Sequence, residues 1–398
     1  MKPKLITNTS GGKSSMAQAI KIKQMYGDSI DQICIFANTG MENEETLEFL
    51  DKCDREYNLN IIWLEAVVHE HGKGNTYRVT NFKDAYRINQ YKDPLHPFHA
   101  HVKKNGVPNA TYPQCSDRLK EQVIESYKKD NDLRGVKQAL GFRIDESSRA
   151  MSKSVRDALS KAGISHDGFG NEIRAGKGFG FGLYMREVRC RMHTSLTALI
   201  DDHNLLWIQD SSKVTSKFIR QVSESEKQAT AYINSNITRT DIDLIGNYCK
   251  KIEKYNLVFP MIDWFPMTKD DVNDFWEEQP FNLELEAHMG NCATCWKKSD
   301  RKLHLIALEN PEKYEAFKWF EETYKHVKPN TGKPIYSDSG TEIGRTEIKD
   351  RVFFRKHRNS EMIIGEAQLM DAYMLRKLIG ANIDDESGCA ESCNGYQL

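Results

Sequence analysis

The residues best suited to chemistry stand near the amino terminus, where residues 8–15 read Asn-Thr-Ser-Gly-Gly-Lys-Ser-Ser. The two glycines lack a Cβ, so successive backbone N–H groups can face one concavity, while the serine hydroxyls and the lysine charge add donors. The helix expected to follow adds the positive end of its dipole. The turn therefore predicts a nucleotide site in which the phosphate chain is held by Ser10, Gly11, Gly12, Lys13, Ser14 and Ser15. It is not a Walker A motif, because a single residue separates Ser10 from Gly12 and the lysine follows at once.

Cysteines supply a second set of candidate groups. Cys292 and Cys295 form a C-x-x-C pair before Trp296-Lys-Lys, a spacing that lets two thiolates hold one metal ion or a cluster iron. Cys389 and Cys393 form a looser pair, and together the four could make a zinc site. A redox or persulfide-carrying thiol pair and purely structural thiols are the alternatives. We expect buried or inert thiols at Cys34, Cys53, Cys190 and Cys249.

Three other groups of side chains leave alternatives open. Asp145 and Glu146 follow a strand end, where they could act as a general base or magnesium ligand, or pair with Arg143 or Arg149. The histidines could bind metal or line a polar substrate entrance; they are His69, His71, His96, His99 and His101. A basic and aromatic stretch could contact nucleic acid or form a solvated helix face; it contains Lys177, Phe179, Phe181, Tyr184, Arg186, Arg189 and Arg191.

The elements that must position these groups alternate between strand and helix. Apolar runs predict strands at 5–7, 32–37, 60–65 and 136–142, with helices at 16–26 and 44–56 between them. Such alternation predicts an α/β fold with a doubly wound, mostly parallel sheet, whose ligands sit beyond the carboxyl ends of the strands. The same pattern places Asn38-Thr39-Gly40 at the end of the second strand.

The later part of the chain reads less regularly. We expect a sheet edge at 256–264, a helix capped by Thr268, helix over 292–325, a surface loop at 329–346 and a last helix at 365–380. The domain prediction is a nucleotide-binding domain from residues 1–150 and 256–325, the second part carrying the C-x-x-C pair. A glycine-rich helical insertion would occupy 151–255, and a C-terminal region with the second cysteine pair 326–398.

Composition excludes several classes of protein. The 398 residues carry a formal net charge of −1, so no global field draws the chain to nucleic acid or membranes. Nine cysteines are too sparse for a disulfide scaffold. We find no signal-peptide pattern and no apolar run of the roughly 20 residues that a transmembrane helix needs, and we therefore expect a cytoplasmic protein without membrane contact.

Several motifs in order carry a family resemblance. They are Ser10-Gly-Gly-Lys-Ser-Ser15, Phe36-Ala-Asn-Thr-Gly-Met-Glu42, Cys115-Ser-Asp-Arg-Leu-Lys120, Gly141-Phe-Arg-Ile-Asp-Glu146, Pro260-Met-Ile-Asp-Trp264 and Gly290-Asn-Cys-Ala-Thr-Cys295. Together they resemble the PP-loop phosphoadenosine phosphosulfate (PAPS) reductase family, which has an adenine nucleotide α-hydrolase-like fold of HUP type. The likeness is closest to the phage and mobile-element branch, similar to DNA phosphorothioation and tRNA-thiolation proteins, and covers roughly 1–150 and 255–325.

The resemblance implies ATP or PAPS at the sheet edge, with Asn38, Thr39 and Gly40 beside the nucleoside. It implies Lys120, Arg143 and Arg149 as anion-neutralising groups, and Cys115 as a further ligand of an iron–sulfur cluster. The expected catalytic residues are Lys13, Ser14, Lys120, Arg143 and Asp145, the expected metal ligands Cys115, Cys292, Cys295, Cys389 and Cys393. The cofactors would be ATP or PAPS with Mg²⁺, and a 4Fe–4S cluster or zinc.

Two departures from the family pattern separate the candidate activities. Ser14 stands where the common loop has Asp, and Glu391-Ser-Cys393-Asn-Gly replaces the reductase motif Glu-Cys-Gly-Leu-His. The leading hypothesis is an ATP-dependent enzyme that adenylates a substrate, including nucleic acid, for sulfur or group transfer. The alternatives are thiol-dependent reduction of PAPS and a nucleotide-binding regulator without turnover. The resemblance also implies a sulfur donor or a ParB/sulfiredoxin-like protein as partner.

Overall fold

The computed structural model describes residues 2–146 and 254–380, except 73, 291, 330–333, 338–339 and 346–349, and a few residues between 154 and 248. Most of the predicted insertion therefore lies outside the described residues. So do the basic stretch and Arg149, and the same holds for Cys190, Cys249, Cys389 and Cys393.

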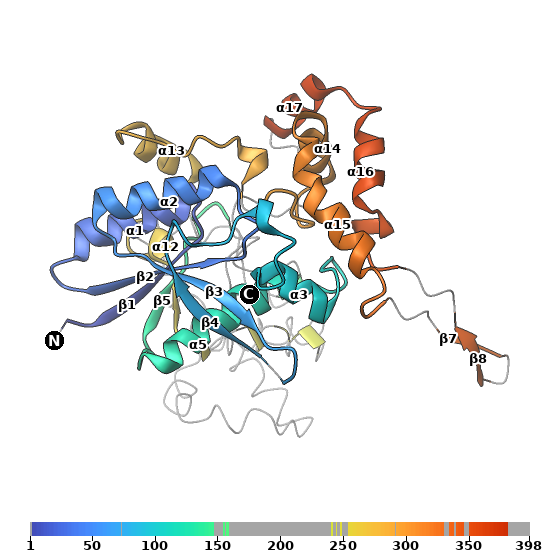
Figure 1. Ribbon diagram of the computed structural model, residues 1–398. Coiled ribbons are helices and arrows are strands. Elements are labelled where there is room, and N and C mark those ends of the chain that lie inside the picture. Colours follow the sequence, from blue (N-terminus) through green and yellow to red (C-terminus); the bar gives the residue numbers. More distant parts are fainter. Residues whose placement is uncertain are drawn as a thin grey trace, which may run out of the picture.

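A six-stranded sheet forms the centre of the molecule (Figure 1), in the order β4-β3-β2-β1-β5-β6. The strands are β1 Lys4–Thr9, β2 Asp31–Asn38, β3 Ile62–Val68, β4 Asn75–Thr80, β5 Lys137–Ala139 and β6 Leu257–Val258. All neighbouring strands pair in parallel except β3 and β4, which are antiparallel. The predicted α/β fold with a mostly parallel sheet is therefore confirmed, and β4 is an edge strand that the sequence reading did not identify.

Helices cover both faces because the central strands are apolar on both sides. In β2, Ile35 packs into one core and the adjacent Phe36 into the other. The helices are α1 Lys13–Tyr26, α2 Glu44–Tyr57 and α13 Lys269–Glu277 near one face, and α3 Pro97–Asn105 and α5 Gln122–Asp130 near the other (Figure 1). This arrangement explains why the strand sequences read as continuous apolar runs.

The position of the site follows from the strand order. β1 lies between β2 and β5, and the chain leaves β1 toward β2 and returns to pair β5 on the other side. Such a reversal opens a crevice at the carboxyl ends of the two strands. The turn with the two glycines leads from β1 to α1 and therefore lies at this crevice.

The second half of the chain differs from the expected elements in four places. Pro260 starts the short helix α12 Pro260–Asp263, so the expected sheet edge is reduced to β6. The expected helix over 292–325 begins only at Ser299, which caps α14 Asp300–Glu309 through its hydroxyl, and continues through α15 Glu315–Tyr324. The expected loop contains a hairpin of β7 Pro334–Tyr336 and β8 Glu342–Arg345. The last helix is two, α16 Ser360–Ala367 and α17 Ala372–Gly380.

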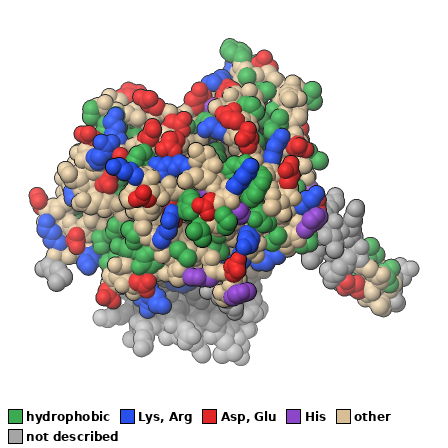
Figure 2. Space-filling model, in the orientation of Figure 1, with side chains coloured by type: hydrophobic (Ala, Val, Ile, Leu, Met, Phe, Trp, Pro, Cys, Tyr) green, Lys and Arg blue, Asp and Glu red, His purple; other side chains and the backbone are tan. Residues whose placement is uncertain are grey.

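Short helical turns complete the architecture and carry several site residues. They are η1 Ile88–Gln90, α4 Gln114–Ser116, η2 Asp117–Glu121, η5 Ala287–Met289, η6 Pro311–Tyr314 and η7 Arg355–His357. On the face drawn in Figure 2, acidic and basic side chains are interspersed, as the near-zero net charge leads one to expect. Among the described helices, none has the length and apolarity needed to cross a membrane.

Candidate functional site

A cavity of about 210 Å³ lies at the carboxyl end of β1. Residues 11–15 line it together with Thr46, Arg143 and Lys269. Three cationic side chains thus surround a space at the amino terminus of α1, where the helix dipole also favours an anion. The arrangement can hold a phosphate or sulfate chain.

The two glycines are needed for different reasons. Gly11 has φ +75°, and a Cβ at this position would lie 2.5 Å from Cγ2 of Thr46, so only glycine fits. Gly12 is the N-cap of α1, with extended backbone angles and no capping side chain. The backbone of the turn can therefore come close to a ligand at the start of the helix.

The serines of the turn do not act alike. Ser15 Oγ accepts a hydrogen bond from the Ser10 backbone N–H at 3.1 Å and donates to the Gly12 carbonyl at 3.0 Å. Its hydroxyl lies 3.0 Å from that of Ser10. Ser10 and Ser15 thus hold the shape of the turn, whereas Ser14 Oγ accepts a hydrogen bond from Arg143 at 2.9 Å.

Arg143 connects the turn with the end of β5. Its guanidinium lies 3.0 Å from Asp145 and 3.2 Å from Glu146, besides its bond to Ser14. Asp145 also accepts a hydrogen bond from the backbone N–H of Lys269, at 3.1 Å. The two carboxylates therefore orient the Arg143 guanidinium. Pairing with Arg143 is one of the two alternatives that the sequence left open for Asp145 and Glu146.

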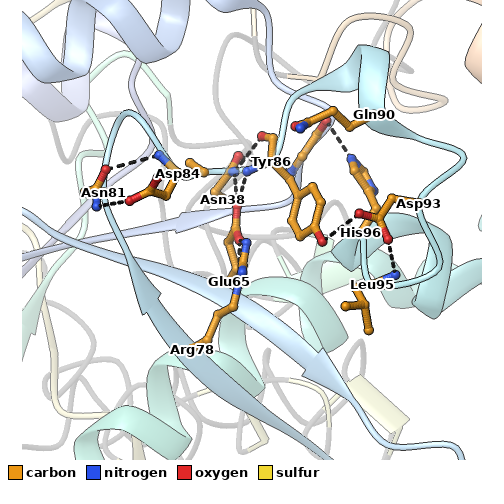
Figure 3. Close-up of polar contacts among 12 residues, drawn as sticks. Asn38, Glu65, Arg78, Asn81, Asp84, Tyr86, Gln90, Asp93, Leu95 and His96 are labelled. Atoms are coloured by element: carbon orange, nitrogen blue, oxygen red, sulfur yellow. Dashed lines mark hydrogen bonds and ion pairs between the residues drawn. The ribbon is translucent and has the colours of Figure 1, made fainter.

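Asn38 is fully buried and belongs to a polar network beneath the loop that follows β2 (Figure 3). Its amide donates to Glu65 at 2.6 Å and to the Tyr86 carbonyl at 3.0 Å, while its oxygen accepts from the Gly40 N–H at 3.1 Å. Glu65 also pairs with Arg78 from β4. These contacts place Asn38 and Gly40 in support of the loop, away from the walls of the 210 Å³ cavity.

His96 packs directly on Gly40. A Cβ at Gly40 would lie 2.3 Å from the ring Nε2, and the residue has φ +80°, so glycine is required here too. Burial lowers the pKa of His96 to about 4, which keeps the ring neutral. His99 and His101 are also buried, and both lie in α3, which Pro97 starts.

Three predicted cysteines meet in a second, smaller pocket of about 30 Å³. Cys115, from α4, lines it with Cys292 and Cys295, and Lys120 and Lys297 contribute to the same walls. Burial is intermediate for all three thiols. Cys115 and Cys292 are far apart in the sequence, and only the tertiary structure brings them to the same pocket.

The C-x-x-C segment is attached to the loop after β2. Cys292 forms an isolated bridge with Glu42, and the Ala293 N–H donates to the Met41 carbonyl at 3.0 Å. Thr39 Oγ1 lies 3.6 Å from Cys292 Sγ, so Thr39 borders the cysteine pocket. Gly290 lines the larger cavity, two residues before Cys292, so one segment contributes to both pockets.

Glu42 was missed as a site residue by the sequence reading. Its carboxylate accepts hydrogen bonds from Thr39 at 3.0 and 2.8 Å, and its other oxygen lies 3.5 Å from Lys120 Nζ. Glu42 and Lys120 are both buried. Lys120 therefore faces the cysteines and not the phosphate turn. The position of Glu42 within the quoted 36–42 motif was the available signal.

The fold and the turn of residues 10–15 are those of an α/β protein of the PP-loop class. Residues 4–162 match the model of the phosphoadenosine phosphosulfate reductase domain family, and this part of the chain belongs to that family. The expected family is therefore confirmed.

Two relatives have no described function. The chain is 21% identical over 398 residues to an uncharacterised nin-region protein of Escherichia phage lambda, covering 99% of this chain and 96% of that protein. It is 29% identical over 147 residues to an uncharacterised protein of Methanocaldococcus jannaschii, covering 37% of this chain and 24% of that protein. The first likeness supports the phage branch. No solved structure gives a significant match.

Proposed function

We propose that the protein binds the phosphate chain of ATP in the 210 Å³ cavity and adenylates a substrate for sulfur or group transfer. The observation that carries this proposal is the convergence of the Gly11–Gly12 turn, the start of α1 and three cationic side chains on one cavity. Preorganised donors of this kind stabilise the negative charge that develops during attack on phosphorus.

The residues have distinct roles in this proposal. The backbone N–H groups of the turn and Lys13 hold the phosphate oxygens, while Arg143 and Lys269, which also line the cavity, offset the negative charge. A substrate oxygen attacks the α-phosphorus and pyrophosphate leaves; a sulfur nucleophile then displaces AMP. Mg²⁺ that accompanies ATP would take most of its ligands from phosphate oxygens and water.

The cysteine pocket supplies the sulfur side of the proposal. Cys115, Cys292 and Cys295 present thiol donors in one partly enclosed space, whose walls also include Lys120 and Lys297. Such soft ligands fit an iron–sulfur cluster or a zinc ion, and these three residues would hold it. When bound, an iron–sulfur cluster would supply electron- or sulfur-transfer chemistry and a zinc ion would supply a Lewis acid. A nucleic acid is one class of acceptor.

A second candidate, reduction of PAPS by a thiol, is favoured by the family to which residues 4–162 belong. In that reaction a thiol attacks the sulfur of PAPS and adenosine 3′,5′-bisphosphate leaves. A second thiol then attacks the S-sulfonated thiol, which forms a disulfide and releases sulfite. The same cavity would hold the ligand. The two candidates differ in their products, pyrophosphate and AMP for the first and sulfite for the second.

The test compares Gly12→Asp with Gly12→Asn. Both residues are favoured N-caps and both suit the extended backbone of Gly12, with φ −89° and ψ 158°, so α1 should be preserved in each. Only Asp adds a negative charge beside the phosphate site. We expect Gly12→Asp to weaken ATP binding in calorimetry at least tenfold more than Gly12→Asn, by about 1.4 kcal/mol or more.

Measuring the products distinguishes the candidate functions from one another. Pyrophosphate release with candidate acceptors should fall in parallel with ATP binding in the Gly12→Asp protein. Equal ATP affinity in the two variants would contradict binding in this cavity. ATP binding without pyrophosphate or sulfite from any acceptor would instead support a regulator that does not turn over its ligand.

A further inference from the structure

We propose that Glu286, His288 and Glu309 bind a divalent first-row transition-metal ion. Each residue offers one ligand atom, and these atoms lie within 4.8 Å of one another. His288 belongs to η5, Glu286 immediately precedes this turn, and Glu309 ends α14. Two separate segments thus bring two carboxylates and an imidazole to one point.

His288 provides an independent reason to expect a ligand. The residue is 4% exposed, and its ring lies between the two carboxylates, with Nδ1 3.4 Å from Glu286 and Nε2 3.3 Å from Glu309. Within the described part of the chain, Nε2 is buried, and its 3.3 Å approach to Glu309 does not have the geometry of a hydrogen bond. A buried polar atom in this state is costly, and a metal ion at Nε2 would satisfy it.

The carboxylates of the site already contact one cation. Two carboxylates beside a histidine carry two negative charges, and Arg376 from α17 now lies against both, 2.7 Å from Glu286 and 2.8 Å from Glu309. The Arg376 side chain is 49% exposed and can turn toward solvent. We infer that a metal ion competes with the guanidinium for the same oxygens. Lys298, the other nearby cation, donates to the His288 carbonyl at 3.0 Å.

The types of ligand atom indicate which metal ion the site would bind. One imidazole and two carboxylates without sulfur suit Mn²⁺ better than the ions that prefer thiolates. Three protein ligands leave at least one coordination position open. Glu286 also lines the 210 Å³ cavity, so the site shares one residue with that cavity. Metal binding itself does not depend on the nucleotide proposal.

The experiment is a titration of chelator-treated full-length protein with Mn²⁺ in the absence of nucleotide, followed by electron paramagnetic resonance of the unbound ion. Mn²⁺ is chosen because it avoids the cysteine pocket. We expect one ion per chain. His288→Gln and Glu309→Gln should each weaken binding about tenfold or more, as loss of even an outer-shell partner costs 10–100-fold.

Two further variants make the result specific. His304→Gln is the matched control, because His304 pairs with Glu366 at 2.9 Å in the neighbouring α14–α16 contact but lacks a second carboxylate; it should leave Mn²⁺ binding unchanged. Arg376→Gln removes the competing cation and should tighten binding several-fold. The proposal is overturned if the wild-type protein binds no stoichiometric Mn²⁺, or if folded His288→Gln and Glu309→Gln proteins, judged by circular dichroism, bind it as well as the wild type.

Discussion

At the scale of single residues, Gly11 and Thr46 show how closely the phosphate turn is fitted to its surroundings. The backbone of Gly11 is left-handed, and its α-carbon faces the methyl group of Thr46 on α2. Any larger residue would meet both a strained backbone and a steric conflict. The turn is therefore shaped by its neighbours and by Ser10 and Ser15 before any ligand arrives.

The cysteines also differ from one another in their local surroundings. Cys53 is fully buried, and burial raises its thiol pKa far above the ordinary value, so it stays an inert thiol. Cys34 has a pKa raised by burial to about 12. Cys292 instead lines a pocket with two other cysteines and two lysines. Reactivity and metal binding should therefore be confined to the second group.

We predict that protein purified without oxygen carries iron with labile sulfide, or zinc, and that Cys292→Ser removes most of this metal. The reason is that one of the thiolates lining the pocket is lost. Metal analysis, a sulfide assay and the visible spectrum provide the measurement. Cys53→Ala is the matched control and should keep the metal. Equal metal content in both variants, or none in the wild type, would argue against the cysteine site.

At the scale of elements, Glu321 of α15 acts as a clamp between segments. Its carboxylate accepts hydrogen bonds from the backbone N–H groups of Phe353, at 2.9 Å, and Ser360, at 2.8 Å, and Ser360 begins α16. Burial raises the pKa of Glu321 to about 7. The folded protein therefore holds a proton that the unfolded chain releases near its ordinary pKa of 4.5.

This difference gives the pH dependence a definite sign. Between pH 4.5 and 7 the native state binds more protons at this site, so the Glu321 contribution to stability falls as pH rises through this window. At about 1.4 kcal/mol per pKa unit, the change is about 3 kcal/mol. We predict that urea unfolding at pH 5 and pH 8 will show this decrease in the wild type and a smaller one in Glu321→Gln. Contributions from His96 and His101 are common to both proteins and cancel; parallel pH profiles would refute the assignment.

At the scale of the whole molecule, the amino-terminal part does not complete its own core. Trp276 of α13 is 1% exposed, packs on Phe49 and donates its indole N–H to the Lys13 carbonyl at 3.0 Å. Met261, Val272 and Phe281 join the same core from beyond residue 254. The phosphate turn thus depends on a segment more than 250 residues away.

We predict that residues 1–146 alone will not fold cooperatively. Each large apolar side chain missing from the core removes roughly 1.5–3 kcal/mol, and several such losses match a typical domain stability of about 5–15 kcal/mol. Near-ultraviolet circular dichroism and a thermal melt of the fragment, compared with the full chain, provide the measurement. A sharp melting transition with native aromatic signals would show that the second half is dispensable.

Much of the fold could be read from local patterns. The strands β1, β2 and β3, the helices α1 and α2 and the Thr268 cap of α13 all carry strong local signals, and they lie close to where they were expected. β4 was missed because it is an edge strand of mixed polarity. Proline at 260 decided the local conformation against the apolar pattern around it.

The sequence alone indicated the glycine turn between β1 and α1 and the parallel sheet, because adjacent glycines and continuous apolar strands are local properties. It also indicated the family, through short motifs in a fixed order. Only the tertiary structure decided that Ser14 meets Arg143, that Cys115 joins Cys292 and Cys295, and that His288 lies between two glutamates. These contacts join residues that are far apart in the chain or on separate segments, except for Glu286 and His288. Their meeting depends on strand order and helix packing, which no local pattern of residues encodes.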